Sequence, residues 1–473
     1  MLQLRLMVYL QKIKEQYKLF IFRQEHIKVS KPLIFYSKEV QSMQREKAKK
    51  EKLRYVTGHV MIWGESKEKT RILLMDNSSS FQKEETPLIR FLDDDFCNQA
   101  YFNGIRHITI EIGKNNPSAI AVDYVSSNNG ELSDVDIICH DQQNPSLIGL
   151  NLPIRGGGLS FIHDIFIKGF KTGINVEGDY PGYTFENIRL EQQLNEGIRH
   201  ISKNIVIHNL TSINKCSAIR CEGSDAITTL IDAELLGGND SETAIENEGH
   251  LFLRNIKSDG YGNVLNDKGV TFSKSFLDEY SSNVIRLSES SPAKSLSLPI
   301  KDTPSYEFPS PHKWTIFDVS KQDDDTDALQ SLIDSGAEYI FIKATDECLK
   351  LRGTVRLGKK LKWIHGGWCN MDVVNEGEPD TPLFLFEDGA NDLIVFEAFS
   401  NGQYRNTFTT FLNVRSKATV IRDVFMGYGD SSYRNYGTGD LFLENVVTGG
   451  GDYGHLPESK EAGWLFENQS GMV

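Results

Sequence analysis

The sequence predicts an all-β protein made of two right-handed parallel β-helices in tandem, the second of them incomplete. After Tyr55, short segments that alternate apolar and polar residues recur at intervals of roughly 20 to 30 residues, within the range of solenoid repeats. Most of these segments end in Gly, Asn or Asp, which favour turns. The spacing leaves room for about three strands and three turns per repeat, but not for a helix. Leucine-rich repeats and β-propellers are disfavoured because their marker residues are missing.

Residues 1–52 form an atypical basic N-terminal segment ahead of the repeats. The run from Arg45 to Lys52 is predicted to be a solvated surface segment, as charge runs usually are. The opening "MLQLRLMVYL" is short, is interrupted by Arg5 and has no clear cleavage site, so the sequence shows no clear signal peptide.

Residues 53–286 are predicted to form the first β-helix, in which alternation decides the direction of each side chain. In "NIRLEQ", Ile188 and Leu190 point inward. When the other segments are aligned on such pairs, one outward column is predicted to contain Glu111, Ile138, Lys168, Glu191, His208, Asp232 and Arg254, and a second to contain Glu397, Arg422 and Glu444. These columns are either ladders of ion pairs or the lining of a shallow groove for a sugar chain.

The position after the column is often Asn or Asp, as at Asn209, Asn255, Asp423 and Asn445. We expect these residues to mark a corner of the coil, with stacked side chains whose amides bond the neighbouring backbone.

Residues 287–313 are rich in Ser and Pro and are predicted to be a linker, and residues 314–473 are predicted to be the second β-helix. Asp325 or Thr326 can cap a short helix that runs to about Ser335 and ends at Gly336. Such a helix would cover the open end of the solenoid. The chain stops in "GWLFENQSGMV", which resembles the middle of a coil.

The amino-acid composition narrows the range of functions that the protein can have. The chain has 473 residues, 39% of them hydrophobic, and a formal charge of −14, which argues against a nucleic-acid partner or an anionic membrane. It contains no apolar run long enough to predict a membrane span. Its 6 cysteines include no CxxC pair, so no metal site and no cofactor are predicted. We expect a monomer whose partner is a polysaccharide or oligosaccharide.

A family resemblance supports the carbohydrate expectation. "DDDTDALQSLIDSG" resembles a shortened Asp-rich motif of the pectate-lyase superfamily of β-helix proteins, without its Gly-Asp-Gly part. "GDYPGYTFENIRLEQQ" and "TAIENEGHLFLRNIKSDGYG" resemble bacterial proteins related to glycoside hydrolase families 28 and 55. The resemblance extends over most of Arg54 to Asn445, and the layout of two β-helices is most similar to family 55. It implies a secreted or extracellular protein that degrades polysaccharides.

Resemblance to family 55 implies an inverting β-1,3-glucanase with its acid and base in a cleft between the two β-helices. Inversion needs two carboxyl groups about 6.5–9.5 Å apart, with a water between them. The acidic clusters "FENIRLEQQ" and "AIENEGH" supply candidates. Glu191 or Gln192 is predicted to orient the water, and Glu246 or Glu248 to act as acid or base. Alternatively, these side chains bond backbone amides in turns.

Six more residues are predicted to contact the sugar, because they are outward-facing or aromatic: Glu186, His208, Arg254, Tyr428, Tyr433 and Glu444. Three other functions stay open. A lyase acting on a uronic-acid polymer would need an Arg or Lys base and usually Ca²⁺, but of the two Asp-Asp-Asp runs, Asp323–Asp325 is better explained by helix capping and Asp93–Asp95 has no matching ligands. A tailspike-like or adhesin-like protein would bind a glycan without cutting it, and a gene fragment would be inactive.

Overall fold

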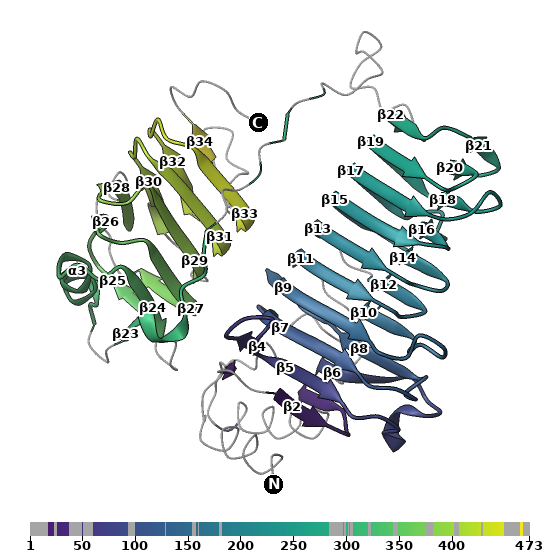
Figure 1. Ribbon diagram of the computed structural model, residues 1–473. Coiled ribbons are helices and arrows are strands. Elements are labelled where there is room, and N and C mark those ends of the chain that lie inside the picture. Colours follow the sequence, from purple (N-terminus) through teal and green to yellow (C-terminus); the bar gives the residue numbers. More distant parts are fainter. Residues whose placement is uncertain are drawn as a thin grey trace. The chain divides into compact units, whose positions relative to one another are not determined.

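The chain divides into two compact units, Lys18–Lys294 and Ser295–Val473 with Met1–Tyr17, and the division falls inside the segment 287–313. In both units the sheets are parallel and stack coil upon coil, which confirms the predicted parallel β-helix (Figure 1). This computed structural model describes residues 18–22, 26–36, 50, 60–92, 100–127, 129–153, 158, 160–178, 182–282, 297, 299–300, 302, 306–319, 323–343, 349–373, 382–401, 406–426, 429–448 and 464–466.

The first β-helix has a larger sheet that contains one long strand from each central coil. Its order is β1-β4-β7-β9-β11-β13-β15-β17-β19-β22, with β2 and β5 joined at the side. The strands are β1 (Lys18–Phe22), β2 (His26–Val29), β4 (Val60–Gly64), β5 (Arg71–Leu74), β7 (Gly104–Ile112), β9 (Gly130–Cys139), β11 (Ser160–Lys168), β13 (Tyr183–Glu191), β15 (Asn204–Asn214), β17 (Ile227–Gly237), β19 (His250–Asp259) and β22 (Phe276–Ser281).

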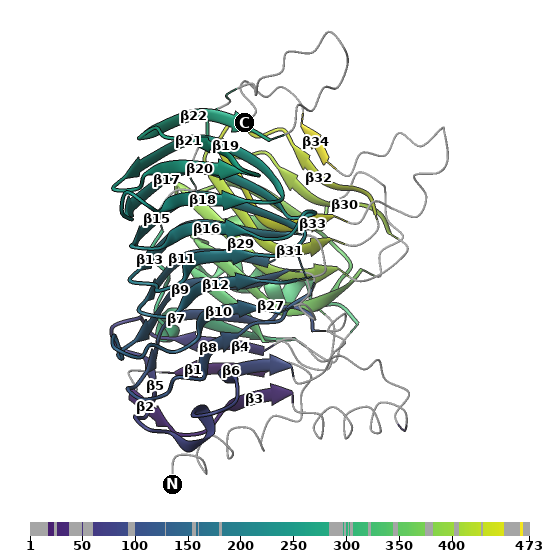
Figure 2. The same ribbon diagram turned by 90° about the vertical axis from the view of Figure 1, so that its right-hand side faces the viewer.

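Its second sheet rises as one stack from β3 to β21 (Figure 2). The strands are β3 (Leu33–Tyr36), β6 (Thr86–Leu92), β8 (Ala119–Asp123), β10 (Ile148–Leu152), β12 (Thr172–Val176), β14 (Glu196–His200), β16 (Ser217–Cys221), β18 (Thr243–Asn247), β20 (Asn263–Asp267) and β21 (Val270–Phe272), with the 3-10 turn η1 (Ser79–Phe81) before β6. At the C-terminal end, β22 and β21 pair antiparallel with β19 and β20 and so cover the last coil.

The first β-helix begins before residue 53, which corrects the expected boundary. Strands β1, β2 and β3 pair in parallel with β4, β5 and β6, so part of the basic N-terminal segment belongs to the sheets. Most of the run from Arg45 to Lys52 lies outside the described residues. These strands were not predicted from the sequence, because each is short and the segment around it is rich in lysine.

Aliphatic side chains stack inside the coils in continuous rows. One row joins residues that pair from strand to strand and are at most 3% exposed: Ile108, Val135, Ile165, Ile188, Leu210, Ala233 and Ile256. The predicted inward direction of Ile188 and Leu190 is confirmed, because both are buried. Stacked rows of this kind bury apolar surface along the whole solenoid.

Each long strand bends at one residue in the left-handed region, with φ between 53° and 58°: His107, Asp134, Asp164, Asn187, Asn209, Asp232 and Asn255. Asn and Asp tolerate this backbone better than other residues with a side chain. The predicted corner is therefore correct. The amides, however, bond the neighbouring side chains and not the backbone. Asn209 Nδ2 donates to Asn187 Oδ1 at 2.7 Å, and Asn255 Nδ2 donates to Asp232 Oδ1 at 2.5 Å.

The predicted outward column is only partly correct. Glu111, Ile138, Lys168 and Glu191 do pair in register and continue to Ile213 and Leu236. His208 pairs instead with Glu186 and Ile231, Arg254 pairs with Ile231, and Asp232 is itself a corner residue. The error arises because the bend interrupts the alternation, so the apolar pairs before and after the corner look alike in sequence.

The second β-helix has a seven-stranded and a five-stranded sheet among the described residues. The first contains β23 (Thr315–Asp318), β24 (Tyr339–Lys343), β25 (Leu349–Leu351), β27 (Trp363–Val373), β29 (Leu393–Asn401), β31 (Ala418–Met426) and β33 (Leu441–Thr448). The second contains β26 (Val355–Lys359), β28 (Phe384–Gly389), β30 (Asn406–Asn413), β32 (Gly429–Asn435) and β34 (Trp464–Phe466). In register, Glu397, Arg422 and Glu444 pair as predicted.

The Asp-rich motif leads into helix α3 (Thr326–Asp334), whose Leu329 and Ile333 are buried in the core of the second β-helix. Asp325 is the N-cap residue, but Asp324 Oδ1 accepts the helix bond, from the Thr326 N–H at 2.9 Å. Asp325 Oδ2 instead accepts from the Lys350 N–H at 3.1 Å. These carboxylates therefore anchor the helix to the first coil, and Gly336, with φ of 92°, follows its end.

Part of the predicted linker packs against the second β-helix. Tyr306, Phe308 and Trp314, on either side of the 3-10 turn η2 (Pro311–Lys313), contact Trp363, Val395 and Val420 on the outer face of its larger sheet. Among the described residues, no helix has the length and apolar character that a membrane crossing requires.

Candidate functional site

A groove crosses successive coils of the first β-helix at the corner where β9, β11, β13, β15 and β17 lead into the second sheet. The turns 140–147 and 238–242 are long and form its two walls, whereas the turns 169–171, 192–195 and 215–216 between them are short and form its floor. Its volume is about 530 Å³. Five coils span roughly 19 Å along the axis, at a strand spacing of about 4.8 Å. The lining residues are Gln142, Pro145, Gly169, Gln192, Gln193, Leu194, Ile213, Asn214, Lys215, Cys216, Gly237 and Glu242.

Asp141 holds the first wall in place. Its Oδ1 accepts hydrogen bonds from the backbone N–H groups of Asn144 at 3.0 Å and Gln143 at 3.2 Å, and its Oδ2 accepts one from Asn115 at 3.0 Å. These bonds, first of all the one from Asn144, lower the pKa of the Asp141 carboxyl. The turn is therefore fixed by its own backbone bonds before any ligand arrives.

Tyr261, from the next coil, holds the floor in place. Its hydroxyl donates to the backbone oxygens of Cys216 at 2.8 Å and Asn214 at 3.2 Å, and burial raises the pKa of Tyr261 above its ordinary value. Gly237, at the foot of the opposite wall, has φ of 112°, and a Cβ there would lie 2.3 Å from the Asn214 oxygen. A side chain is excluded at this position because it would meet the backbone of the neighbouring strand β15.

Polar groups of the floor bond one another. The Gln193 N–H donates to Asn214 Oδ1 at 2.8 Å, and Cys216 Sγ donates to the Gln193 oxygen at 3.4 Å. Burial, with Glu196 and Glu242 nearby, raises the pKa of the Cys216 thiol to about 12. The thiol is therefore protonated at neutral pH and is not a nucleophile, since the thiolate is the reactive form.

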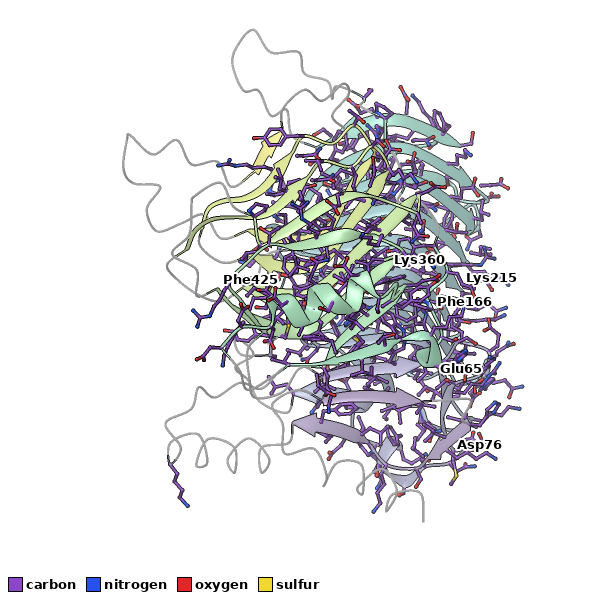
Figure 3. The ribbon with its side chains drawn as sticks, turned by 90° about the vertical axis from the view of Figure 1, so that its left-hand side faces the viewer. Glu65, Asp76, Phe166, Lys215, Lys360 and Phe425 are labelled. Carbon is purple, nitrogen blue, oxygen red and sulfur yellow. The ribbon has the colours of Figure 1, made fainter. Side chains whose placement is uncertain are left out.

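The groups that face solvent in the groove are of mixed character. Gln142 Nε2 donates to Gln192 Oε1 at 3.5 Å and links the wall to the floor, and both side chains are exposed. Lys215 is exposed on the outer edge of the first β-helix (Figure 3), and Glu242 is partly exposed. Leu194 is 56% exposed. Amide, ammonium and carboxylate groups therefore lie beside apolar surface, a combination typical of ligand sites.

Of the predicted catalytic residues, Gln192 lines the groove and Glu191 lies at its rim. Glu191 is the last residue of β13 and pairs in register with Ile213, which lines the groove. Its carboxylate accepts from Arg189 Nε at 2.8 Å and lies 3.7 Å from Lys168 Nζ. Glu191 is thus held between two cations beside the groove.

Glu246 and Glu248 lie elsewhere, on and just after β18. Glu246 pairs in register with Arg220 of β16, which in turn pairs with Arg199 of β14. Two strand spacings therefore separate Glu246 from β14, and most of the length of β14 separates Arg199 from the turn that contains Gln192. This is about 10 Å across the strands and at least about 10 Å along them. The structure therefore does not bring the two predicted carboxyl clusters together.

Glu246 belongs to a polar ladder on the outer face of the second sheet that was not predicted from the sequence. Asn175 Nδ2 donates to Asn151 Oδ1, and Asn151 Nδ2 to Asp123 Oδ1, each at 2.8 Å. At the other end Asn266 Nδ2 donates to Glu246 Oε2 at 2.7 Å. The available signal was a polar residue near the end of successive five-residue strands, fifth in β8 (Asp123) and fourth in the next six: Asn151, Asn175, Arg199, Arg220, Glu246 and Asn266.

Three predicted sugar contacts share one column of the larger sheet. Glu186 pairs with His208, His208 with Ile231, and Ile231 with Arg254. His208 Nε2 lies 3.2 Å from Asp232 Oδ2 of the corner ladder. This column is on the other side of the left-handed corner from Glu191, so its side chains face a different direction from the groove.

The remaining predicted contacts are in the second β-helix. Glu444 Oε2 lies 3.8 Å from Arg422 Nε, which is also 3.5 Å from Glu397 Oε1. Tyr433 is 0% exposed, and its ring packs 6.2 Å from that of Phe411 between centroids. The expectation that Tyr433 stacks on a sugar is therefore wrong, because its ring fills the core. Tyr428 lies outside the described residues, as do Asp93–Asp95.

In comparisons of the sequence with known proteins, no family model and no curated protein matches the chain.

Proposed function

We propose that this chain is a carbohydrate-active β-helix protein that binds a glycan strand in the groove between the turns 140–147 and 238–242. The observation that carries the proposal is a groove with a fixed wall and floor that presents Gln142, Gln192, Lys215 and Glu242 beside the exposed Leu194. The elongated site spans several coils, as a polymer of repeating units requires.

The groups in the groove match the chemistry of sugars. Hydroxyl groups donate and accept hydrogen bonds at once, and the side-chain amides of Gln142 and Gln192 do the same. Leu194 and Ile213 offer apolar surface to the C–H groups of a sugar ring. Asp141 holds one wall and Tyr261 holds the floor before binding, so little conformational entropy is lost when the ligand arrives.

Hydrolysis of an O-glycosyl bond is the second candidate function, and two carboxylates favour it. Glu191 at the rim and Glu242 in the lining lie two coils apart, about 9.6 Å along the axis. This axial component alone reaches the limit of the range of about 6.5–9.5 Å for inverting enzymes, so the hydrolytic candidate requires the two side chains to approach each other when the glycan binds. Glu191, between two cations, would activate the water as a base, and Glu242 would protonate the leaving oxygen.

A glycan panel tests both candidates. We expect the protein to be retarded in gels that contain a soluble glucan, and expect Gln192→Ala combined with Lys215→Ala to abolish the retardation. Lys274→Ala, an exposed lysine outside the groove, is the matched control and should bind as the wild type does. Failure to bind any glycan would overturn the proposal.

The same panel separates binding from catalysis. Release of reducing sugar that is lost in Glu242→Gln, with retained retardation, supports the hydrolase. Retardation without release identifies a binding protein. A rise in ultraviolet absorbance from an unsaturated uronide, with polygalacturonate as substrate, would identify a lyase and contradict the hydrolytic candidate.

A further inference from the structure

The outer face of the larger sheet carries an aromatic side chain beside the groove. One outward column, between the left-handed corner and the groove, contains Thr109, Asp136, Phe166, Arg189, Thr211, Glu234 and Lys257. All but Phe166 are polar or charged. An aliphatic row inside the coil has a packing role, but this position points outward, so packing of the core does not require a phenyl ring there.

Phe166 is only partly buried, and it lies on β11 three residues before Gly169, which lines the groove. Three residues of strand place the ring roughly 10 Å from the floor. Figure 3 shows Phe166 and Lys215 on the same side of the first β-helix. The side chain is thus part of a surface that continues from the floor of the groove onto the sheet.

The charges around this surface balance. Lys168 and Arg189 flank Glu191, at 3.7 Å and 2.8 Å. Lys67 Nζ lies between two carboxylates, 3.0 Å from Asp134 Oδ1 and 3.1 Å from Asp136 Oδ1. Within the groove, Lys215 and Glu242 contribute one charge of each sign. A surface without excess charge does not select a polyanion such as a polyuronate, nor a polycation.

We propose that Phe166 is a stacking platform for one sugar ring of a neutral glycan whose chain continues into the groove. This inference rests on the proposed function and adds the class of ligand to it. An aromatic ring packs best on a pyranose whose hydroxyl groups are equatorial, because both faces then expose C–H groups. The neighbouring Arg189 and Glu191 can bond the hydroxyls at the edge of that ring. The ligand class is therefore a neutral chain of pyranoses whose hydroxyl groups are equatorial.

The test compares calorimetric affinities of the full chain for a soluble β-glucan, an α-linked dextran and polygalacturonate. We expect both neutral glucans to bind more tightly than polygalacturonate, and expect Phe166→Ala to weaken the binding of the β-glucan about tenfold, with Phe166→Trp close to wild type. Phe276→Ala is the matched control. Phe276 pairs with Lys257 at the end of the same column, is 44% exposed and lies beyond the last coil of the groove.

The outcomes separate the two proposals. If the wild type binds none of the three polymers, the proposed function itself fails. If it binds the β-glucan, and Gln192→Ala weakens binding but Phe166→Ala does not, the groove stands and the platform is refuted. Equal losses of affinity in Phe166→Ala and Phe276→Ala would also refute the stacking platform. Tightest binding to polygalacturonate would refute the neutral ligand class. Thermal unfolding of each variant shows whether a loss of affinity reflects a loss of fold.

Discussion

His200 is predicted to make the first β-helix sensitive to mild acid. It is the last residue of β14 and is 0% exposed. Its Nε2 lies 2.9 Å from the Ser202 oxygen, and its Nδ1 lies 2.9 Å from Thr228 Oγ1. Because the carbonyl oxygen can only accept, Nε2 donates to it, and Nδ1 accepts from the hydroxyl. The neutral imidazole is thus fully bonded.

Burial is the main cause that lowers the pKa of His200, to about 4. The unfolded chain takes up this proton near its ordinary pKa of about 6.5, so between these values the unfolded state holds more protons than the folded state. The contribution to stability is complete above about pH 6.5 and is lost as the pH falls toward 4. A difference of about 2.5 pKa units corresponds to about 3 kcal/mol of unfolding free energy.

His200→Gln removes the titration and keeps one donor and one acceptor. Urea unfolding of the wild type and the variant at pH 7.0, 5.5 and 4.5 should show a smaller fall in stability for the variant, by about 2–3 kcal/mol over this interval. Carboxylates elsewhere titrate in both proteins and cancel in the comparison. Parallel pH profiles for the two proteins would refute the argument.

Three further predictions follow from single contacts. Glu111 Oε1 bonds His140 Nε2 at 3.2 Å and raises the pKa of His140, so Glu111→Gln should lower that pKa in an NMR titration. The stabilisation from this pair is present below about pH 6.5 and disappears as the pH rises through the folded pKa of His140. Asn187→Ala should cost about 1–2 kcal/mol in urea unfolding because Ala resists the left-handed backbone, and Asn187→Gly should cost less. Thr326→Val should destabilise the second β-helix by about 1–3 kcal/mol in the same measurement, because the hydroxyl accepts from the N–H groups of Arg352 and Gly353 at 3.0 and 3.1 Å.

The rows inside the coils were predictable from the sequence because burial imposes a local pattern. Ile188 and Leu190 alternate with polar neighbours in one strand, and a similar alternation recurs in β15, β17 and β19. Asn209 was also predictable as a corner, because few residues with a side chain accept its backbone. What alternation cannot show is which apolar pair of one strand meets which pair of the next. His208 was therefore placed beside Glu191, whereas its strand partner is Glu186.

The groove was only partly predictable. Gln192 was recognised as a polar residue in an acidic cluster, but its neighbours Gln142 and Glu242 come from turns 50 residues away on either side along the chain. The groove exists because the turns 140–147 and 238–242 are longer than those between them, and turn length becomes informative only when the coils are in register. Tyr433 was misplaced for a related reason, since an aromatic residue in a Gly-rich segment can face either the core or solvent.

The most direct test of the central claim is hydrogen–deuterium exchange of the full chain with and without a soluble β-glucan oligosaccharide. If the groove is the binding site, amide exchange slows in peptides that cover the turns 140–147, 192–195, 215–216 and 238–242. Exchange at the antiparallel cap, β21 and β22, and in α3 of the second β-helix should be unchanged. Saturating ligand that leaves all four turns unprotected, or that protects a different face, would contradict the account.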